Sequence, residues 1–246
     1  MLPPCRWYPR GVENRRVKPG TGAIDERFTD YLRRQADGIM QVQYTHPLVR
    51  GIRSGTLDLA RFKVWVRQNY VYLIEFARLF SLASARAPDL AWITHYAGLA
   101  EFTLKTEIEL HRSYAREFGV LEVELERERK APTCQAYTDF LVRTAAMGSA
   151  GEFAAAFLPC VWGYTEIAQQ LLDQGLPYEP HYAKWIGMYC GPEQVELNER
   201  ARTLVDDAAA GQPKAELDRM ETAYLISARY EYLFWDMCWN NETWPV

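Results

Sequence analysis

The chain has little of what marks several large classes of protein. It carries 28 lysines and arginines against 32 aspartates and glutamates, which gives a net charge of −4, and it has no basic stripe of the kind that binds nucleic acid. No uninterrupted apolar run approaches the roughly 20 residues that a membrane-spanning helix needs. The first residues also lack the apolar segment of a secretory signal. We therefore expect a soluble protein whose partners are neither nucleic acids nor membranes.

Cysteine and histidine are scarce as well. The five cysteines are odd in number and form no C-x-x-C pair, which suits a reducing cytoplasm and argues against a disulfide framework or a zinc knuckle. The four histidines offer few ligands for a metal centre. Neither a phosphate-binding loop nor a G-x-S-x-G nucleophile elbow occurs. We predict a cytoplasmic protein that uses no metal and no cofactor.

What the chain does have is enough apolar material for one large core. Apolar residues make up 48% of its 246 residues, and no linker-like stretch divides it, so a single domain is expected. We assign residues 25–246 to this domain. Residues 1–24 mix arginine with proline and glycine, and we predict that they form an arm that is poorly ordered or that contacts another subunit.

The periodicity of the apolar residues is helical wherever it is clear. In residues 58–86 they recur at steps of three and four, as at Phe62, Trp65 and Val66. No run alternates in the manner of a strand. The predicted helices are Phe28–Gln43, Asp58–Arg86, Leu90–Phe118, Thr133–Met147, Gly151–Asp173, Pro192–Ala210 and Pro213–Trp239, with short pieces at His46–Arg53 and His181–Tyr189. This pattern predicts an all-α, single-domain bundle of seven or more helices.

One carboxylic acid lies in an apolar stripe of the last predicted helix. Glu231 follows Ser227 and precedes Phe234 at helical spacing, so its side chain is expected to point toward the core. A buried carboxyl group must be paired, hydrogen-bonded or protonated, because burial disfavours its charged form and raises its pKa. Glu231 is therefore either a general acid and base for chemistry near neutral pH, or a partner of a tyrosine hydroxyl or an arginine that only orients helices.

A cysteine holds a similar position on the helix predicted over residues 151–173. Pro159 cannot donate a hydrogen bond to the carbonyl of Ala155, so we expect a kink just before Cys160. The kink could aim this thiol into a cavity, but a free cysteine is more commonly a small buried hydrophobe. Cys134 is a weaker candidate for a reactive thiol, since a helix N-terminus lowers the pKa of a cysteine in its first turn.

An amide interrupts the stripe of residues 58–86. If the side chain of Asn69 points inward, both its oxygen and its nitrogen need hydrogen-bond partners. A bound polar small molecule could supply them. Tyrosines could add hydroxyl groups and flat faces to such a site, and those considered are Tyr72, Tyr137, Tyr164 and Tyr189.

The sequence gives a weaker indication of a metal site. Glu107 and His111 form an E-x-x-x-H pair at a spacing that metals can use, but no second pair completes a di-iron site. We expect Glu107, Glu109 and His111 to lie on a solvated or subunit-facing surface. The charged run of residues 122–130 is expected to be a solvated helical connector.

Several longer motifs occur together and in one order. They are HPLVRGIRSGTLDLARFKVWVRQNYVYLIEFAR at residues 46–78, the E-x-x-x-H segment at 107–111, AYTDFL at 136–141, LPCVWGYTEIA at 158–168, YAKWIGMYCG at 182–191 and SARYEYLFWDM at 227–237. On these motifs the chain, from about residue 28 to residue 239, resembles the TenA family, also called thiaminase II. The resemblance implies the haem-oxygenase-like helical fold.

The resemblance also implies an activity and a set of residues. The family hydrolyses aminopyrimidines in thiamin salvage and cleaves thiamin itself, and its members are often tetramers. Its nucleophilic cysteine corresponds to Cys160, and its acid and base glutamate corresponds to Glu231. The substrate-lining residues implied are Tyr72, Tyr137, Tyr164, Tyr189 and Phe234, together with Asn69.

Asn69 departs from the family pattern, where an aspartate is usual. A neutral amide can still pair with an aminopyrimidine edge, as asparagine pairs with adenine, but it cannot stabilise a protonated ring. Losing about 1.4 kcal/mol of such stabilisation would slow the reaction roughly tenfold. One alternative is therefore a protein that binds a heterocycle without turning it over. A metal- or haem-dependent oxidase of the same fold, based on Glu107 and His111, is a third hypothesis.

Overall fold

The computed structural model describes residues 26–87 and 89–246, and within these ranges the regular structure is helical throughout. The all-α prediction is confirmed. The predicted arm of residues 1–24 lies outside the described residues. In the part of the chain that is described, no helix is both long and apolar enough to span a membrane.

The α-helices vary in length from six residues to 28. In chain order they are α1 (Phe28–Gln35), α2 (Asp37–Tyr44), α3 (Pro47–Ser54), α4 (Leu59–Arg86), α5 (Leu90–Phe102), the π-helical turn η1 (Thr103–Glu107), α6 (Ile108–Glu117), α7 (Glu122–Arg127), α8 (Pro132–Met147), α9 (Ala150–Asp173), α10 (Pro180–Tyr189), α11 (Pro192–Ala209) and α12 (Lys214–Asn240).

Local signals explain where several of these helices begin. Before α3, the Nδ1 atom of His46 accepts a hydrogen bond from the backbone N–H of Leu48, and Pro47 occupies the first turn. Asp58 caps α4 in the same way. Ser149 begins α9 with a reciprocal capping box that it shares with Glu152. The starts of α3, α4 and α9 are therefore encoded locally.

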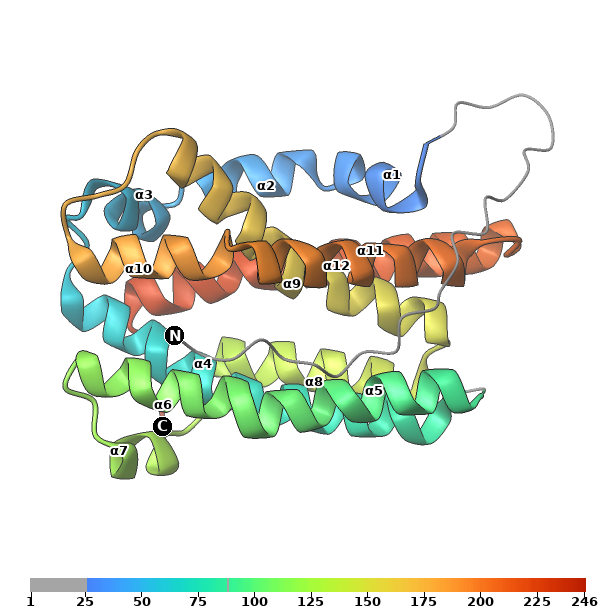
Figure 1. Cartoon of the computed structure of the whole chain (residues 1–246), viewed down its shortest axis with the longest axis horizontal. Helices are drawn as coiled ribbons and strands as arrows, with labels where there is room; N and C mark the ends of the chain where they lie inside the picture. Colours follow the sequence, from blue (N-terminus) through green and yellow to red (C-terminus); the bar gives the residue numbers. More distant parts are fainter. Residues whose placement is uncertain (1–25, 88) are drawn as a thin grey trace.

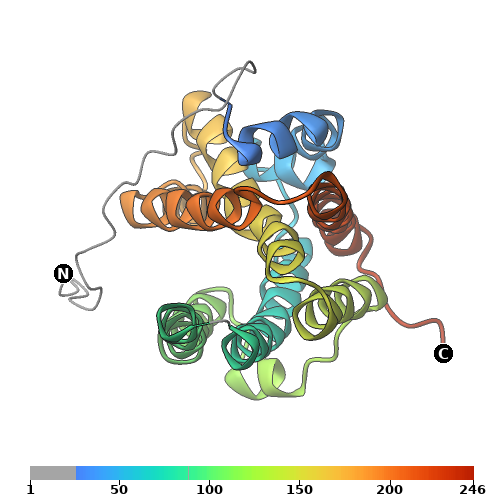
Figure 2. The same ribbon diagram turned by 90° about the vertical axis from the view of Figure 1, so that its right-hand side faces the viewer.

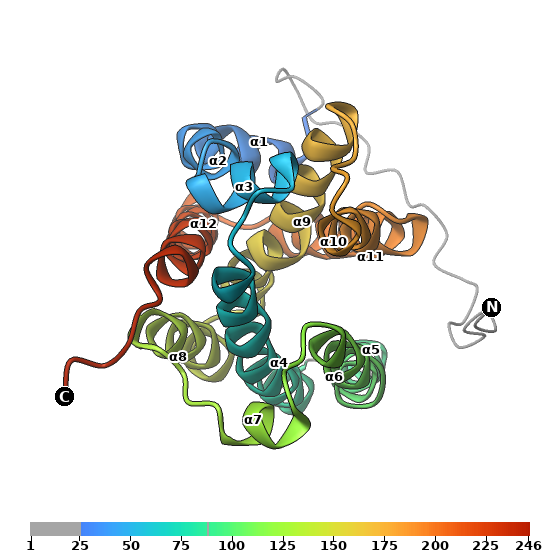
Figure 3. The same cartoon turned by 90° about the vertical axis from the view of Figure 1, so that its left-hand side faces the viewer.

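The two long helices α4 and α9 form the middle of the bundle. Figure 1 shows the long axes of most helices lying roughly parallel, and the two end views in Figures 2 and 3 show the other helices placed around α4 and α9. In the described chain, α9 packs most extensively against α12 and α11, whereas α4 packs against α5 and α8. Segments far apart in sequence thus meet around the ends and flanks of two central helices.

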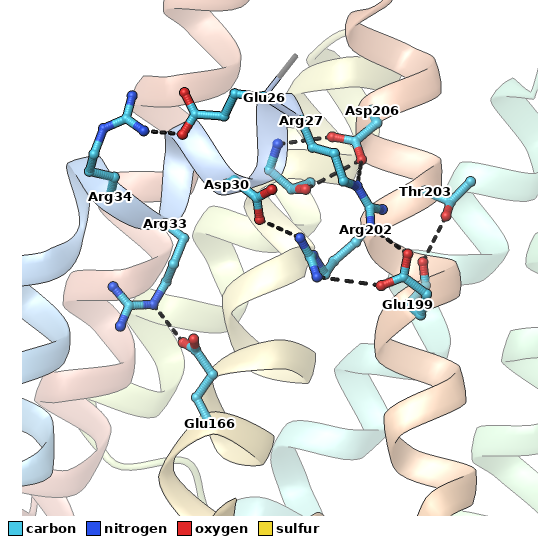
Figure 4. A network of polar contacts seen from close by, with 11 residues as sticks. Glu26, Arg27, Asp30, Arg33, Arg34, Glu166, Glu199, Arg202, Thr203 and Asp206 are labelled. Atoms are coloured by element: carbon cyan, nitrogen blue, oxygen red, sulfur yellow. Dashed lines mark hydrogen bonds and ion pairs between the residues drawn. The ribbon is translucent and has the colours of Figure 1, made fainter. Parts of the chain in front are cut away.

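Ion pairs fasten the first helix to the rest of the bundle (Figure 4). The carboxylate of Asp206 on α11 accepts hydrogen bonds from the backbone N–H of Thr29, at 2.9 Å, and from Nε of Arg27, at 2.5 Å. Nε of Arg33 lies 2.7 Å from a carboxylate oxygen of Glu166 on α9. Because Asp206 satisfies a free N–H in the first turn of α1, it caps that helix from a neighbouring one.

Two predicted helices are interrupted. The first breaks at Ala36, whose φ of −88° and ψ of 3° end α1 just before the turn-prone Asp37-Gly38 pair. The helix predicted over residues 90–118 contains η1, a turn of π-helix that inserts extra backbone and rotates the residues that follow. The other long helices match their predicted ranges to within one or two residues.

Candidate active site

A cavity lies where α4, α8, α9 and α12 meet, and α6, α10 and α11 complete its wall. The space that it leaves for water-sized molecules is about 90 Å³, and one water molecule needs about 10–15 Å³ of such space. All eight site residues implied by the sequence line it: Asn69, Tyr72, Tyr137, Cys160, Tyr164, Tyr189, Glu231 and Phe234. The remaining wall includes Glu107, His111, Gln194 and several apolar side chains.

Glu231 contributes a buried carboxyl group to this cavity. Its residue is 4% exposed, and its Oε1 atom accepts a hydrogen bond of 2.5 Å from the hydroxyl of Tyr137. The same hydroxyl lies 2.8 Å from Oγ of Ser227. Burial raises the pKa of Glu231 to about 7, although the hydrogen bond from Tyr137 acts in the opposite direction. Both roles left open by the sequence fit here, because the group bonds a tyrosine and also titrates near neutrality.

Cys160 presents its thiol to the same cavity. Its Sγ atom donates a hydrogen bond of 2.7 Å to the carbonyl oxygen of Phe157, rather than to the carbonyl of Ala155 that Pro159 leaves without its helical partner. Burial first, and the nearby Glu231 carboxyl second, hold the pKa of the thiol well above its usual value. Near neutral pH, Cys160 is therefore a thiol that must give up a proton before or while it attacks a substrate.

Aromatic rings form the sides of the cavity. The ring of Tyr72 lies 5.4 Å from that of Tyr137 and 5.9 Å from that of Phe234, while Tyr164 and Tyr189 lie 4.9 Å apart. The hydroxyl of Tyr72 is buried beside Cys160 and makes no hydrogen bond of good geometry within the described residues. An unpaired buried hydroxyl is costly in the empty protein, so it is available to a ligand.

Asn69 reaches the cavity from α4 and is held by a histidine. Its Nδ2 atom lies 2.6 Å from Nε2 of His111, and Nδ1 of that ring lies 2.9 Å from the backbone carbonyl oxygen of Glu107. Asn69 and His111 are 7% and 6% exposed. Burial lowers the pKa of His111, so its imidazole is neutral at neutral pH.

The prediction that Glu107 and His111 lie at the surface is wrong. Both line the cavity, whereas Glu109 is exposed as expected. Glu107 ends the π turn, which brings Thr103 and Ile108, five residues apart, to the same buried face. The carboxyl of Glu107 accepts a hydrogen bond of 2.9 Å from Thr103, and burial raises its pKa.

No group of three or more potential metal ligands is present among the described residues. In the E-x-x-x-H pair itself, both ring nitrogens of His111 are already used by Asn69 and by a backbone carbonyl. The pair is therefore arranged to hold the amide of Asn69 rather than to bind a metal.

Cys134 also differs from its prediction. It does lie in the first turn of α8, but it is fully buried and its Sγ atom lies 3.8 Å from the carbonyl oxygen of Gln68. Burial raises the pKa of its thiol to about 12, which outweighs any lowering by the helix N-terminus. Cys134 does not line the cavity.

The charged run before α8 is only in part a solvated connector. Residues 122–127 form α7 as a helix, but Glu126 accepts a hydrogen bond of 2.7 Å from Tyr70 and pairs with Arg112. Glu128 accepts a hydrogen bond of 2.7 Å from Gln68 on α4. These charges fix the connector to the helix that carries Asn69.

His111 is the main residue of the cavity wall that the sequence analysis missed. The signal was present, because His111 lies on one helical face with Tyr114, Ala115 and Phe118, all of which are buried. Its polar character and its place beside exposed glutamates favoured a surface position instead. The partner of Asn69 comes from a helix more than forty residues away in the chain, and spacing alone does not reveal such a pair.

The fold and the cavity together define a class of protein: an α-helical bundle with a small interhelical cavity lined by aromatic rings, a thiol and a carboxylic acid. Residues 33–241 match the model of the TENA/THI-4/PQQC family, and the chain belongs to this family.

Known proteins of similar sequence and structure agree with this assignment. The chain is 37% identical over 220 residues to the aminopyrimidine aminohydrolase of Halalkalibacterium halodurans, a match that covers 88% of this chain and 97% of that protein. The structure is similar to that of a TenA homologue from P. horikoshii, with a TM-score of 0.81 and 28% identity over 87% of this chain and 99% of that one. A domain from Shewanella denitrificans described as having a heme oxygenase-like fold gives a TM-score of 0.68 at 13% identity, covering 87% and 90% of the two chains. The predicted haem-oxygenase-like fold is confirmed.

Proposed function

We propose that this protein is a hydrolase that acts on a carbon–nitrogen bond of an aminopyrimidine or of thiamin, with Cys160 as nucleophile and Glu231 as acid and base. One observation carries the proposal: the thiol of Cys160 and the carboxyl of Glu231 line the same small cavity between aromatic walls. Relatives named for aminopyrimidine hydrolysis support the substrate class.

The reaction proposed exchanges an amine for a hydroxyl group. The sulfur of Cys160 adds to the pyrimidine ring, and its proton passes to a ring nitrogen. The amine on the exocyclic methylene group then leaves with a proton supplied by Glu231, and the bond between that carbon and the nitrogen breaks. Water adds to the same carbon and gives a proton back to Glu231, after which sulfur leaves the ring and recovers its proton from the ring nitrogen. The net change is an aminomethyl group plus water to a hydroxymethyl group plus ammonia.

The protonation states at the site suit this sequence. A carboxyl group with a pKa of about 7 donates and accepts protons with similar ease at neutral pH, which is what alternate acid and base steps require. Tyr137 holds this group in place through its hydrogen bond. The unpaired hydroxyl of Tyr72 and the amide of Asn69 remain available to orient the ring.

Steady-state hydrolysis of an aminomethyl-aminopyrimidine tests the proposal. We expect Cys160→Ala and Glu231→Gln each to lower kcat by at least about a hundredfold, a typical size for loss of acid–base or covalent catalysis. Cys134→Ala and Glu221→Gln are the matched controls, because they remove a thiol and a carboxyl group outside the cavity, and they should retain turnover. Full activity in either cavity variant would remove that residue from its proposed role.

Asn69 favours a second candidate function, binding without turnover. The neutral amide offers hydrogen bonds but no charge for a protonated ring. Calorimetry that detects micromolar binding, with no product after long incubation of the wild-type protein, would favour this candidate. Clear turnover would exclude it.

The proposal also covers the cellular location and the oligomeric state of the protein. We place the protein in a reducing cytoplasm, and the free state of the four cysteines within the described residues supports this placement. We also propose a homotetramer, which is supported by large apolar side chains exposed along α5, η1 and α6: Leu90, Ile93, Phe102, Leu104 and Leu110. Light scattering of the purified protein measures the oligomer mass directly.

A further inference from the structure

The backbone carbonyl of Glu107 determines the proton position on His111. A carbonyl oxygen can only accept a hydrogen bond, so the contact of 2.9 Å requires that Nδ1 of His111 carries the hydrogen. In a neutral imidazole the other nitrogen, Nε2, is then an acceptor. It lies 2.6 Å from the amide of Asn69, which must present its NH₂ group, and not its oxygen, to the ring.

This arrangement fixes which way the amide of Asn69 points. Rotating the amide by half a turn would place its oxygen against Nε2 and would replace a hydrogen bond with a contact between two acceptors. Both side chains are more than nine-tenths buried, so water cannot readily compensate the loss. His111 therefore selects one of the two orientations that an asparagine side chain can otherwise adopt.

With its orientation fixed by His111, the amide of Asn69 still has hydrogen-bonding atoms available for a ligand. The bond to His111 uses one of the two hydrogens on Nδ2, so one donor hydrogen remains beside the acceptor Oδ1. The only hydrogen bond found for the Asn69 side chain within the described ranges is the one to His111. Asn69 thus offers an acceptor beside a donor, and the matching ligand edge has a donor beside an acceptor.

Two kinds of pyrimidine differ at that edge. A neutral 4-aminopyrimidine presents an amino donor beside the ring-nitrogen acceptor N3, as adenine does to asparagine. A 4-oxopyrimidine in its lactam form presents the reverse, a carbonyl acceptor beside an N3–H donor. It could pair with Asn69 only if the amide turned over and lost its bond to His111.

We propose that His111 is a specificity-determining positioning residue, which makes the site select 4-aminopyrimidines over their 4-oxo analogues by holding Asn69 in one amide orientation. This inference rests on the proposed function, because it places the pyrimidine edge against Asn69. It adds a residue that touches no substrate and acts only through another side chain.

Calorimetric binding of two probes, 4-amino-2,5-dimethylpyrimidine and its 4-oxo analogue, tests the inference. For the wild-type protein we expect the amino compound to bind at least about a hundredfold more tightly, since a polar site left with unmatched partners rejects an analogue strongly. In His111→Gln the ratio should fall about tenfold or more. A glutamine amide can itself turn to accept from, or donate to, Asn69 in either orientation.

Two further variants separate this role from a merely structural one. His111→Phe fills a similar volume without any acceptor and should also lower the ratio of the two affinities. His95→Gln changes a histidine outside the cavity and should leave the ratio as in the wild type. Melting temperatures identify variants that fail to fold. If both variants fail to fold, the wild-type protein still tests the inference, because equal affinities for the two probes would overturn it.

The possible results point to different conclusions. Equal affinities of the two probes in the wild type, or a ratio unchanged in folded His111→Gln and His111→Phe, would overturn the inference while leaving the hydrolase proposal intact. If the wild type binds neither probe, the proposed function fails and the inference falls with it.

Discussion

Glu231 and Cys160 line one cavity, and burial favours the protonated form of each. The pKa of the thiol is also raised by the neighbouring carboxyl group. Glu231 alone is brought into the physiological range, with a pKa of about 7. At the scale of single residues, the cavity therefore holds one group that exchanges protons easily near neutral pH and one thiol that stays protonated there.

The raised pKa of Glu231 predicts a pH-dependent stability. Between pH 4.5 and 7 the folded state holds a proton that the unfolded state has released, so the free energy of unfolding falls as pH rises through this window. Below pH 4.5, protonated Glu231 contributes its full share of roughly 3 kcal/mol to the free energy of unfolding. This share is lost as the pH rises through 7. Urea unfolding of the wild type and of Glu231→Gln, measured from pH 4.5 to 8, checks this. A difference between the two proteins that does not change with pH would contradict it.

The same group predicts an inflection in the pH profile of activity. We expect kcat/KM of the wild type to change near pH 7, because this parameter reports essential groups of the free enzyme. Glu231→Asp, which keeps a carboxyl group, should retain an inflection, although at a shifted pH. A wild-type profile that is flat between pH 6 and 8 would assign the acid and base role to another residue.

Replacing Asn69 by aspartate is predicted to raise kcat. Asn69→Asp restores a negative charge at the ring edge, and if this charge is worth about 1.4 kcal/mol in the transition state, kcat should rise roughly tenfold. Asn69→Ser serves as a neutral control and should lower activity. An equal or lower kcat in the aspartate variant would show that charge at this position does not limit the reaction.

At the scale of helices, α1 is stabilised by Asp206, a residue of α11. Asp206 accepts hydrogen bonds from the backbone of Thr29 and from Arg27, so Asp206→Asn should lower the free energy of unfolding by about 1 kcal/mol. The exposed neighbour Asp207 provides a matched control, and Asp207→Asn should have little effect. Denaturant titration measures both. Equal effects of the two changes would mean that the bonds accepted by Asp206 do not stabilise α1.

Helix positions were largely predictable because apolar periodicity and local caps determine them. Asp58 and Ser149 are local start signals, and the stripes they introduce contain Asn69 and Cys160. The π turn before α6 was not predictable, since it has no glycine or proline to mark it and only rotates the following residues. His111 was placed on the surface because it is polar and lies beside exposed glutamates, so the sequence named a thiol, an acid and aromatic residues for the cavity but not the histidine that holds Asn69.

At the scale of the whole molecule, the cavity is assembled from helices far apart in the chain. Its walls come from α4, η1, α6 and α8–α12, so a bound ligand would contact helices from both halves of the chain. A ligand present at a hundred times its Kd stabilises the folded state by about 2.7 kcal/mol. For a chain of this size we expect the Tm to rise by about 5–10 °C with an aminopyrimidine and not with an isolated thiazole. Equal shifts with both compounds would argue against pyrimidine selectivity.

In the proposed mechanism, Cys160 and Glu231 act on one ring in one sequence of steps. Residues that act as a unit lose their effect together, so the second substitution costs little once the first is made. The most direct measurement is kcat for Cys160→Ala, Glu231→Gln and the folded double variant. We predict that the double variant lies within about threefold of the slower single variant. Losses that multiply would contradict the account, because they would mean that the two groups act independently.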